Sequence, residues 1–396
     1  MKRISIFLLI LLHISCNIQI VDKKEHTRNL LDKIVKQYLP DKRDHIFEIS
    51  IDKIGDKVIV SGKSDYPKAE KTLIDALKKN NIPYENKIVS LPTGSFKNIK
   101  GITRLSVANL RAQPKHSAEL VTQTLMGMPL IPLEEKNGFI RVKTPENYYA
   151  WVDKAGIELK QISDFNQWLN KPKIIITVNY GQSYAEKDKK EVVSDYVLND
   201  VFALIKSGKD FYQVQYPDEK TAFIPKSDAI LLTDFEKLAK EVNGQKIIRQ
   251  AQKLIGTPYL WGGTSSKGMD CSGFTKTVYA SFNYNLPRDA SQQVKIGKEI
   301  EMNKKDFSNL QSGDLLFFGY EKDGKTKITH VAIHIGNGKI IHATGEVKIE
   351  SLNPKDPNFN PERLKSLKAV RRIINFYPQN FSQTYQSSKI KNGLIR

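Results

Sequence analysis

Two segments of the chain look like copies of one unit, and this repetition restricts the possible fold more than any other feature. The first copy contains GFIRVKTPENYYAWV, and the second contains DFYQVQYPDEKTAFI. Aromatic residues recur at the same spacing in both, Phe139 before Trp151 and Phe211 before Phe223. Turn-forming residues lie between the two apolar runs of each copy, which is typical of a β-hairpin. The repetition predicts two small β domains of the same kind.

The stretch before the first copy extends this prediction. SVANLRAQPKHSAELVTQTLMG has a strand-like run around Leu110, a loop with proline, and a second run that ends near Gly127. It resembles the start of a bacterial SH3-like barrel. We therefore expect two all-β SH3-like barrels, at residues 97–162 and 168–236, which usually bind ligands or shape a site and rarely carry reaction chemistry.

The segment 22–95 shows a mixed pattern instead. Apolar side chains recur at helical spacing in 28–38 and 68–79. Short strand-like runs occur at 46–51, 57–61 and 85–91. The order αββαβ predicts a small two-layer α+β domain. It resembles the BON-like modules of bacterial envelope proteins, and we find no pattern in it that carries chemistry.

The first residues predict the compartment. Two basic residues precede an apolar run, 4–12, that is far too short to span a bilayer. We interpret residues 1–16 as a secretory signal peptide; a buried N-terminal strand or helix is the alternative. The segment resembles a bacterial lipoprotein signal with Cys16 as the lipidated residue, although His13 stands where that pattern has leucine. Cleavage without lipidation is the other possibility, so we expect an exported protein in the periplasm or envelope, lipid-anchored or secreted.

The net charge bears on the partners of the protein. The 396 residues carry a formal net charge of +19. Lysine and arginine are spread along the chain without a dense cluster beside aromatic residues, so we expect no nucleic-acid partner. Attraction to anionic envelope polymers or lipid headgroups suits an exported basic protein better. We expect a monomer that touches the membrane only through a lipid at Cys16.

Cys271 is the one cysteine besides Cys16. It has no intramolecular partner, so the mature domains are expected to hold no disulfide. A lone thiol in an oxidising compartment indicates use in chemistry. The alternative is a buried cysteine that serves as a small apolar side chain.

The neighbours of Cys271 favour use in chemistry. A glycine-rich loop precedes it, and Phe274, Val278 and Phe282 follow at helical spacing, so Cys271 is expected in the first turn of a helix. Unpaired N–H groups and the positive end of the helix dipole would then lower the pKa of the thiol. The thiolate is the nucleophile in cysteine chemistry. The same N–H groups would form an oxyanion hole.

A base for this thiol is expected on the predicted hairpin THVAIHIGNGKIIHATG. A two-residue loop would place His342 opposite Ile333, with His330 on the other face. A three-residue loop, 336–338, would place His342 opposite Ala332, so that both histidines share one face. We adopt the second register because the chemistry needs it.

Cys271, His330 and His342 together would supply a nucleophile, a base and a group that orients the base. Each histidine alone could equally be a core or surface residue. His334, on the same strand, is given no role. A zinc site is the other interpretation of cysteine with histidines, but no pair has the close spacing of structural zinc ligands.

Four motifs carry a resemblance to the NlpC-type cell-wall cysteine peptidases. They are, in chain order, YLWGGTSSKGMDCSGF, LPRDASQQ, GDLLFF and HVAIHIGNGKIIHATG. The resemblance implies a reduced papain-like α+β domain at 243–376, with the cysteine-bearing helix packed on an antiparallel sheet. It implies no cofactor and no metal. A polar C-terminal tail, 377–396, would follow.

Members of this family hydrolyse peptide bonds in peptidoglycan stems, commonly the bond between γ-D-glutamate and a diamino acid. The resemblance implies the same roles for the cysteine and the two histidines. It places Tyr259 near the oxyanion site and has Asp270 and Ser272 line the glutamyl pocket. Whether the diamino acid is diaminopimelate or lysine stays open.

Two barrels before such a peptidase resemble the γ-D-glutamyl-L-diamino acid endopeptidases, which act on released murein tripeptides or tetrapeptides. The resemblance implies that the first barrel walls one end of the cleft. Asp289 and Glu119 would hold the free amine of the leading L-alanine, and Tyr149 or Trp151 would cover it. Ala290 stands where relatives often have a serine that bonds the substrate.

Other functions compete with this hypothesis. The protein could be a wall-binding protein whose peptidase domain no longer reacts, although the intact cysteine and histidine set argues against this. It could also be a general hydrolase of intact peptidoglycan, an amidase, or an acyl transferase of similar fold.

Overall fold

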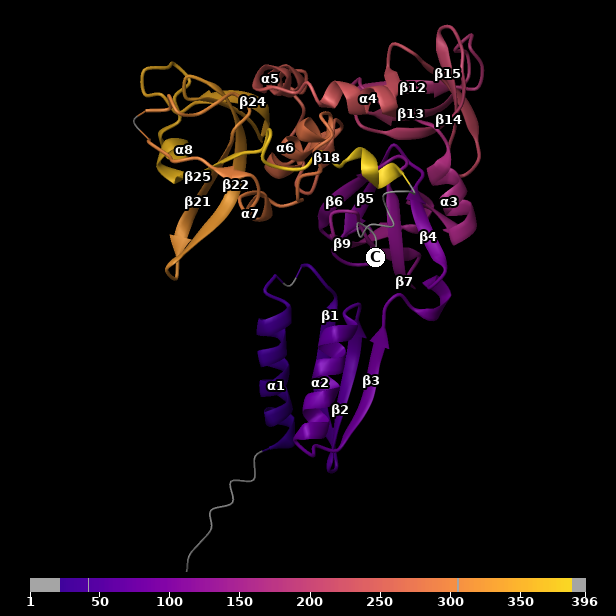
Figure 1. The fold of residues 1–396 in the computed structure, drawn as a ribbon, viewed down its shortest axis with the longest axis vertical. Coiled ribbons are helices and arrows are strands. Elements are labelled where there is room, and N and C mark those ends of the chain that lie inside the picture. The colour runs from indigo at the N-terminus through magenta and orange to yellow at the C-terminus, as the bar shows by residue number, and fades with distance from the viewer. Residues whose placement is uncertain (1–21, 42, 305, 387–396) are drawn as a thin grey trace, which may run out of the picture. The chain divides into compact units, whose positions relative to one another are not determined.

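The computed structural model describes residues 22–41, 43–304 and 306–386, and the chain divides into two compact units after Ser90 (Figure 1). The predicted signal peptide, with Cys16, lies outside the described residues. No helix in the described part of the chain combines the length and the apolar character needed to cross a membrane.

The N-terminal unit has the predicted αββαβ order. Its elements are α1 (Lys23–Tyr38), β1 (Phe47–Ile54), β2 (Lys57–Ser64), α2 (Pro67–Lys79) and β3 (Tyr84–Ser90). β2 is the central strand, antiparallel to β1 and parallel to β3. Leu73 and Leu77 of α2 are fully buried against Val58 and Val60 of β2, so the core lies between the helices and the sheet.

The second unit begins with a seven-stranded antiparallel sheet. Its strands are β4 (Ile99–Thr103), β5 (Val107–Arg111), β6 (Leu120–Leu125), β7 (Pro129–Lys136), β8 (Phe139–Lys143), β9 (Tyr149–Asp153) and β10 (Ile157–Gln161). The strand order is β10-β4-β7-β8-β9-β5-β6. Short 3-10 turns, η1 (Gly94–Phe96) and η2 (Lys154–Gly156), lie before β4 and before β10.

A second seven-stranded sheet follows with the same topology. Its strands are β11 (Lys173–Ile176), β12 (Tyr180–Tyr184), β13 (Val192–Val197), β14 (Val201–Ser207), β15 (Phe211–Gln215), β16 (Thr221–Pro225) and β17 (Ala229–Leu231). Its order is β13-β12-β16-β15-β14-β11-β17, which is the order of the first sheet when read from the other edge.

The two predicted hairpins pair in the same way. Phe139 faces Asp153 across β8 and β9, and Phe211 faces Pro225 across β15 and β16. Each turn contains a residue with a positive φ angle, Asn147 at 63° or Glu219 at 72°. The hairpin prediction is therefore confirmed in both copies.

Two helices were not expected from the sequence. α3 (Ile162–Asn170) follows the first sheet and α4 (Leu232–Ala239) follows the second. Each buries a short apolar face, with Phe165 and Trp168 on α3 and Phe235 on α4. Helices this short show too little periodicity to be recognised from the sequence.

The last part of the chain is α+β, as predicted. Its helices are α5 (Gly244–Gln252), α6 (Cys271–Ala280), α7 (Ala290–Gln293) and α8 (Pro361–Ser366). The sheet order is β20-β25-β21-β22-β23-β24, all antiparallel. Its strands are β20 (Lys298–Glu299), β21 (Leu315–Lys322), β22 (Lys325–Gly336), β23 (Lys339–Thr344), β24 (Glu346–Ser351) and β25 (Leu367–Arg372), and a two-stranded ribbon, β18 (Thr264–Ser265) with β19 (Gly268–Met269), precedes α6.

Helix α6 lies at the centre of this part. All ten of its residues are buried, and Phe274 and Val278 pack with Val331 and Ile333 of β22. The predicted packing of the cysteine-bearing helix on an antiparallel sheet is confirmed (Figure 1).

The predicted polar tail is wrong for residues 377–386. A 3-10 turn, η3 (Ser382–Tyr385), forms there, and Phe381 and Tyr385 are buried with residues of the second sheet and of α4. Burying these two aromatic rings stabilises a segment that is otherwise polar. Residues 387–396 of the predicted tail lie outside the described part.

Candidate active site

Cys271 is the first residue of α6, as the sequence predicted. Asp270 caps the helix, since its carboxylate accepts the Gly273 N–H at 2.8 Å. The thiol is 7% exposed and lines a cavity of about 440 Å³. The N–H groups of the first helical turn have no partner within the helix, so they can hold an oxyanion beside the sulfur.

Asp270 is also half of a buried ion pair that sequence analysis missed. Arg288, which is 2% exposed, places Nη2 at 2.5 Å and Nη1 at 3.1 Å from the two carboxylate oxygens. Arg288 Nη1 donates as well to Ser272 Oγ at 3.0 Å. Asp270 and Ser272 do line the cavity, but Arg288 joins them there and neutralises the carboxylate. The adjacent Arg and Asp of LPRD were the available signal, and only the Asp was given a role.

The turn that joins the two histidine strands differs from the prediction. Gly336 pairs with Lys339, so the loop holds only Asn337 and Gly338, with φ angles of 51° and 73°. Two positive φ angles are typical of a tight Asn-Gly hairpin turn. The predicted three-residue loop is therefore wrong.

The predicted face of the histidines is nevertheless confirmed. A bulge before Gly336 shifts the register, so that Ile333 pairs with Ile341 and the next position brings His342 opposite Ala332. His330 Nε2 lies 2.7 Å from His342 Nδ1. The bulge therefore places both histidines on one face, an effect that the sequence analysis attributed to a longer loop.

Glu350 extends the two histidines into a chain of three groups. It lies on β24, and its Oε2 is 3.2 Å from His342 Nε2. The hydrogen bond with His342 is the main reason that the pKa of Glu350 is lowered to about 2. Nothing in the sequence around Glu350 indicated this position, because it depends on how β24 pairs with β23.

This ionised carboxylate fixes the protons on both rings. A carboxylate only accepts, so its contact at 3.2 Å favours the tautomer of His342 with the proton on Nε2 and the lone pair on Nδ1. His330 must then donate from Nε2 to His342. The other nitrogen of His330, Nδ1, keeps its lone pair and is free to act as a base.

The sulfur of Cys271 lies beside the histidine strand. The backbone N–H of Val331, which follows His330 on β22, hydrogen-bonds to the thiol together with the Ser272 N–H. His330 is therefore the direct chain neighbour of Val331, whose N–H bonds to the sulfur. This arrangement can support nucleophilic attack with proton transfer to an imidazole.

The expected low pKa of Cys271 is not found. Burial raises the pKa of the thiol to about 11, and Asp270 acts in the same direction, against the two N–H groups that bond to the sulfur. Burial also lowers the pKa of His330 well below its usual value, helped by the charge of Arg363. Burial disfavours both charged forms, so the resting pair is a neutral thiol and a neutral imidazole.

We expect Cys271 to be alkylated slowly by iodoacetamide at pH 7. Its rate should keep rising with pH toward the thiol pKa of about 11, well past the ordinary value of about 8.5. Intact mass measured against time over a pH series gives the profile, and a Cys271→Ala sample gives the background. A rate that levels off below the ordinary pKa would contradict the neutral resting pair.

The first sheet contributes directly to this cavity. Gln123 of β6 accepts the Thr264 N–H at 2.9 Å and the Ser265 hydroxyl at 3.0 Å through Oε1. Arg288 Nε donates to Thr122 Oγ1 at 2.9 Å. These contacts hold β6 against the loop before Cys271, and Glu119, just before β6, lines the cavity.

The acidic residues and Tyr259 are brought together as predicted. Glu119, Asp289 and Tyr259 all line the cavity with Cys271. Asp289 also caps α7 in a capping box with Gln292. Burial, together with the negative groups nearby, raises the pKa of Tyr259 to about 12, so its hydroxyl keeps its proton.

The two aromatic residues that were predicted to cover the amine lie elsewhere. Trp151 is buried under the Arg141 guanidinium, and Tyr149 lies beside the Lys143 amine, so neither lines the cavity. Tyr148, the residue just before β9, lines it instead.

Trp261 is the third aromatic residue of the cavity, after Tyr259 and Tyr148, and it was given no role from the sequence. It is 63% exposed, and its Nε1–H donates to Glu119 Oε1 at 2.7 Å. A tryptophan within a glycine-rich loop, where little can cover it, was the available signal. Ala290 lines the cavity with a methyl group, so it offers no hydrogen bond there.

Comparison with known proteins divides the chain in the same way. Residues 256–362 match the NlpC/P60 family, and residues 106–158 match the bacterial SH3 domain. A γ-D-glutamyl-L-lysine dipeptidyl-peptidase of Bacillus subtilis is 31% identical over 265 residues, which cover 64% of this chain and 81% of that protein. Dipeptidyl-peptidase 6 of Lysinibacillus sphaericus is 27% identical over 280 residues, which cover 68% of this chain and 97% of that protein.

Solved structures share the fold. The crystal structure of an NlpC/P60 family protein from Bacillus cereus gives a TM-score of 0.59 at 24% identity, covering 70% of this chain and 100% of that one. An NlpC/P60 endopeptidase from Photobacterium damselae gives a TM-score of 0.52 at 16% identity, covering 70% of this chain and 72% of that one.

Proposed function

The chain belongs to the NlpC/P60 family, and from this premise we propose that it is a cysteine peptidase that hydrolyses the γ-D-glutamyl–diamino acid bond of peptidoglycan stem peptides. Two relatives whose names state that activity are 31% and 28% identical to this chain in sequence. The substrate lies outside the cytoplasmic membrane, which suits the predicted export signal.

The residues of the site suit acyl transfer through a thioester. The Cys271 sulfur attacks the γ-carbonyl while His330 Nδ1 takes the thiol proton. First-turn N–H groups of α6, with Tyr259 at the cavity wall, stabilise the oxyanion. His330 returns the proton to the leaving amine, and water then hydrolyses the thioester. His342 and Glu350 keep His330 in the tautomer whose Nδ1 is basic.

The proposal extends to the free N-terminus of a released peptide. The observation that carries it is that Glu119, from the first sheet, lines the same cavity as Cys271 and Asp289. Two carboxylates that line one cavity favour an ammonium group, and Trp261 offers it an aromatic face. An acyl group on the alanine nitrogen would remove that charge and add bulk against the first sheet.

The expected preference for free over N-acylated peptides is smaller than it would be if both carboxylates were fully buried. Glu119 is exposed and Asp289 is half-buried in the unliganded protein, so water can solvate both carboxylates when the amine is missing. Each charge-assisted hydrogen bond is worth about 1.5–3 kcal/mol. Losing two of them should lower kcat/KM by about 10²-fold or more.

The test compares L-Ala-γ-D-Glu-L-Lys and its diaminopimelate counterpart with their N-acetylated forms and with whole sacculi. We expect the free peptides to be cut about 10²-fold better. Asp289→Asn keeps the helix cap but removes the charge, and Glu119→Gln keeps an acceptor for Trp261. Both variants should slow the free peptides and barely change the acetylated ones.

The matched control is Asp164→Asn, an acidic residue on α3 that does not line the cavity. Equal kcat/KM on free and acetylated peptides would overturn the amine proposal. The protein would then be better described as a general wall hydrolase whose β domains bind the wall.

A further inference from the structure

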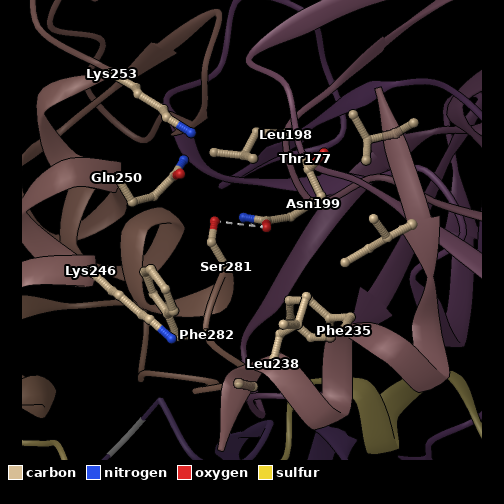
Figure 2. Close-up of a pocket in the computed structure, with 13 residues that line it drawn as sticks. Thr177, Leu198, Asn199, Phe235, Leu238, Lys246, Gln250, Lys253, Ser281 and Phe282 are labelled. Carbon is tan, nitrogen blue, oxygen red and sulfur yellow. Dashed lines mark hydrogen bonds between the residues drawn. The ribbon is translucent and has the colours of Figure 1, made fainter. Parts of the chain in front are cut away.

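A second cavity, which we call the α5 cavity, lies between the second sheet and the helices α4, α5 and α6 (Figure 2). Its volume is about 290 Å³, and none of its lining residues lines the Cys271 cavity. The proposed peptidase reaction does not use this cavity. Its lining contains two lysines and no acidic residue among the described residues.

Much of the lining of the α5 cavity is apolar. Side chains from four different parts of the fold form it, namely Leu198, Ile230, Phe235, Leu238 and Phe282. Apolar walls with a few placed polar groups are typical of small-molecule sites of about 300–1,000 Å³, so this cavity suits a small ligand.

Two polar residues of the lining offer hydrogen-bond donors. Gln250 on α5 is 8% exposed, and its Nε2 is buried without a hydrogen-bond partner. An unpaired buried donor destabilises the protein, and a ligand acceptor would remove that cost. Lys253, the C-cap residue of α5, follows three residues later, and Figure 2 shows both side chains extending toward the cavity.

The other polar groups of the cavity already have partners. Asn199 accepts from the Ser281 hydroxyl at 3.0 Å (Figure 2). It also donates to the Thr277 carbonyl at 3.0 Å. Lys246 pairs with Glu241 at 3.3 Å. The donors on Gln250 and Lys253 are thus the ones left for a ligand, and a positive amine beside an amide N–H favours an anion.

We propose that the α5 cavity binds a carboxylate carried on a short apolar chain. The carboxylate accepts from Gln250 Nε2 and Lys253 Nζ, and the chain packs against Leu198, Phe235 and Phe282. A short fatty acid and the C-terminus of a small apolar peptide share this chemistry. Binding would connect the second sheet to α5, so it also stabilises their packing.

The experiment is calorimetric titration of the full-length protein with octanoate, octanol and octylamine. Octanoate should bind saturably, and the two ligands without a carboxylate should bind about tenfold more weakly or worse. N-acetyl-Leu-Leu forms the second arm. Tighter binding of the peptide assigns the site to peptide C-termini, and tighter binding of octanoate assigns it to fatty acids.

Two variants test the polar residues of the α5 cavity, Lys253 and Gln250. Lys253→Met should weaken octanoate about tenfold, whereas Lys240→Met, at the C-cap of α4 outside the cavity lining, should change nothing. Gln250→Leu should abolish binding and raise the melting temperature of the ligand-free protein, because it removes an unpaired buried donor.

Failure of octanoate to bind saturably overturns the proposal, as does equal affinity for the three head groups or an unchanged affinity in Lys253→Met. Binding is measured and not hydrolysis, so neither result depends on the proposed reaction.

Discussion

Replacing Cys271 with alanine is expected to abolish peptide hydrolysis, with a loss of at least about 10⁴-fold in kcat. Without the sulfur no thioester can form, and the remaining groups only bind and polarise the substrate. The measurement is release of the diamino acid from L-Ala-γ-D-Glu-L-Lys under saturating substrate.

The variant is expected to fold normally, because alanine is smaller than cysteine by one sulfur atom. Its circular dichroism and melting temperature provide the control. The Cys271→Ser variant keeps the side-chain shape more closely, and it should be as inactive as Cys271→Ala. Hydrolysis at the native rate by a folded Cys271→Ala protein would show that the nucleophile lies elsewhere.

The histidines and Glu350 should give graded losses. His330→Ala is expected to lower kcat by about 10²–10⁴-fold, because it removes the base. His342→Ala should cost less, since water can partly replace an orienting group. Glu350→Gln should cost least, because an amide oxygen can still accept from His342.

The pH profile separates positioning from simple structural damage. The charge of Glu350 raises the pKa of His330, against burial and the charge of Arg363, which lower it. Removing the Glu350 charge should therefore lower that pKa further and move the acidic limb of kcat/KM to lower pH. An acidic limb that stays in place, or moves to higher pH, would contradict the proposed chain of three groups.

His334 supplies the matched control on the same strand. It is 1% exposed, and its Nδ1 lies 3.1 Å from the Gln311 carbonyl oxygen. His334→Ala should lower the melting temperature but leave kcat of the folded protein nearly unchanged. If it lowered kcat more than His330→Ala does, the assignment of the base would be wrong.

Much of the site could be predicted because its chemistry lies in short motifs. The helix that begins at Cys271 followed from apolar spacing after a glycine-rich loop. His330 and His342 were correctly predicted to lie on one face, but from a three-residue loop that does not form. The sequence does not show that a bulge near Ile335 changes the strand register next to a two-residue turn.

The remaining features depend on contacts between distant segments. Glu350 reaches His342 only through the pairing of β24 with β23, and Arg288 meets Asp270 only after the loop folds back. The pKa of Cys271 was predicted in the wrong direction, because the helix terminus was visible in the sequence and the burial was not.

The most direct test of the central claim is mass analysis of the products from L-Ala-γ-D-Glu-L-Lys-D-Ala with the wild-type protein. We predict two products, L-Ala-D-Glu and L-Lys-D-Ala, and neither should form with Cys271→Ala. Release of free L-alanine or of free D-alanine, with the γ-D-glutamyl–lysine bond intact, would contradict the account.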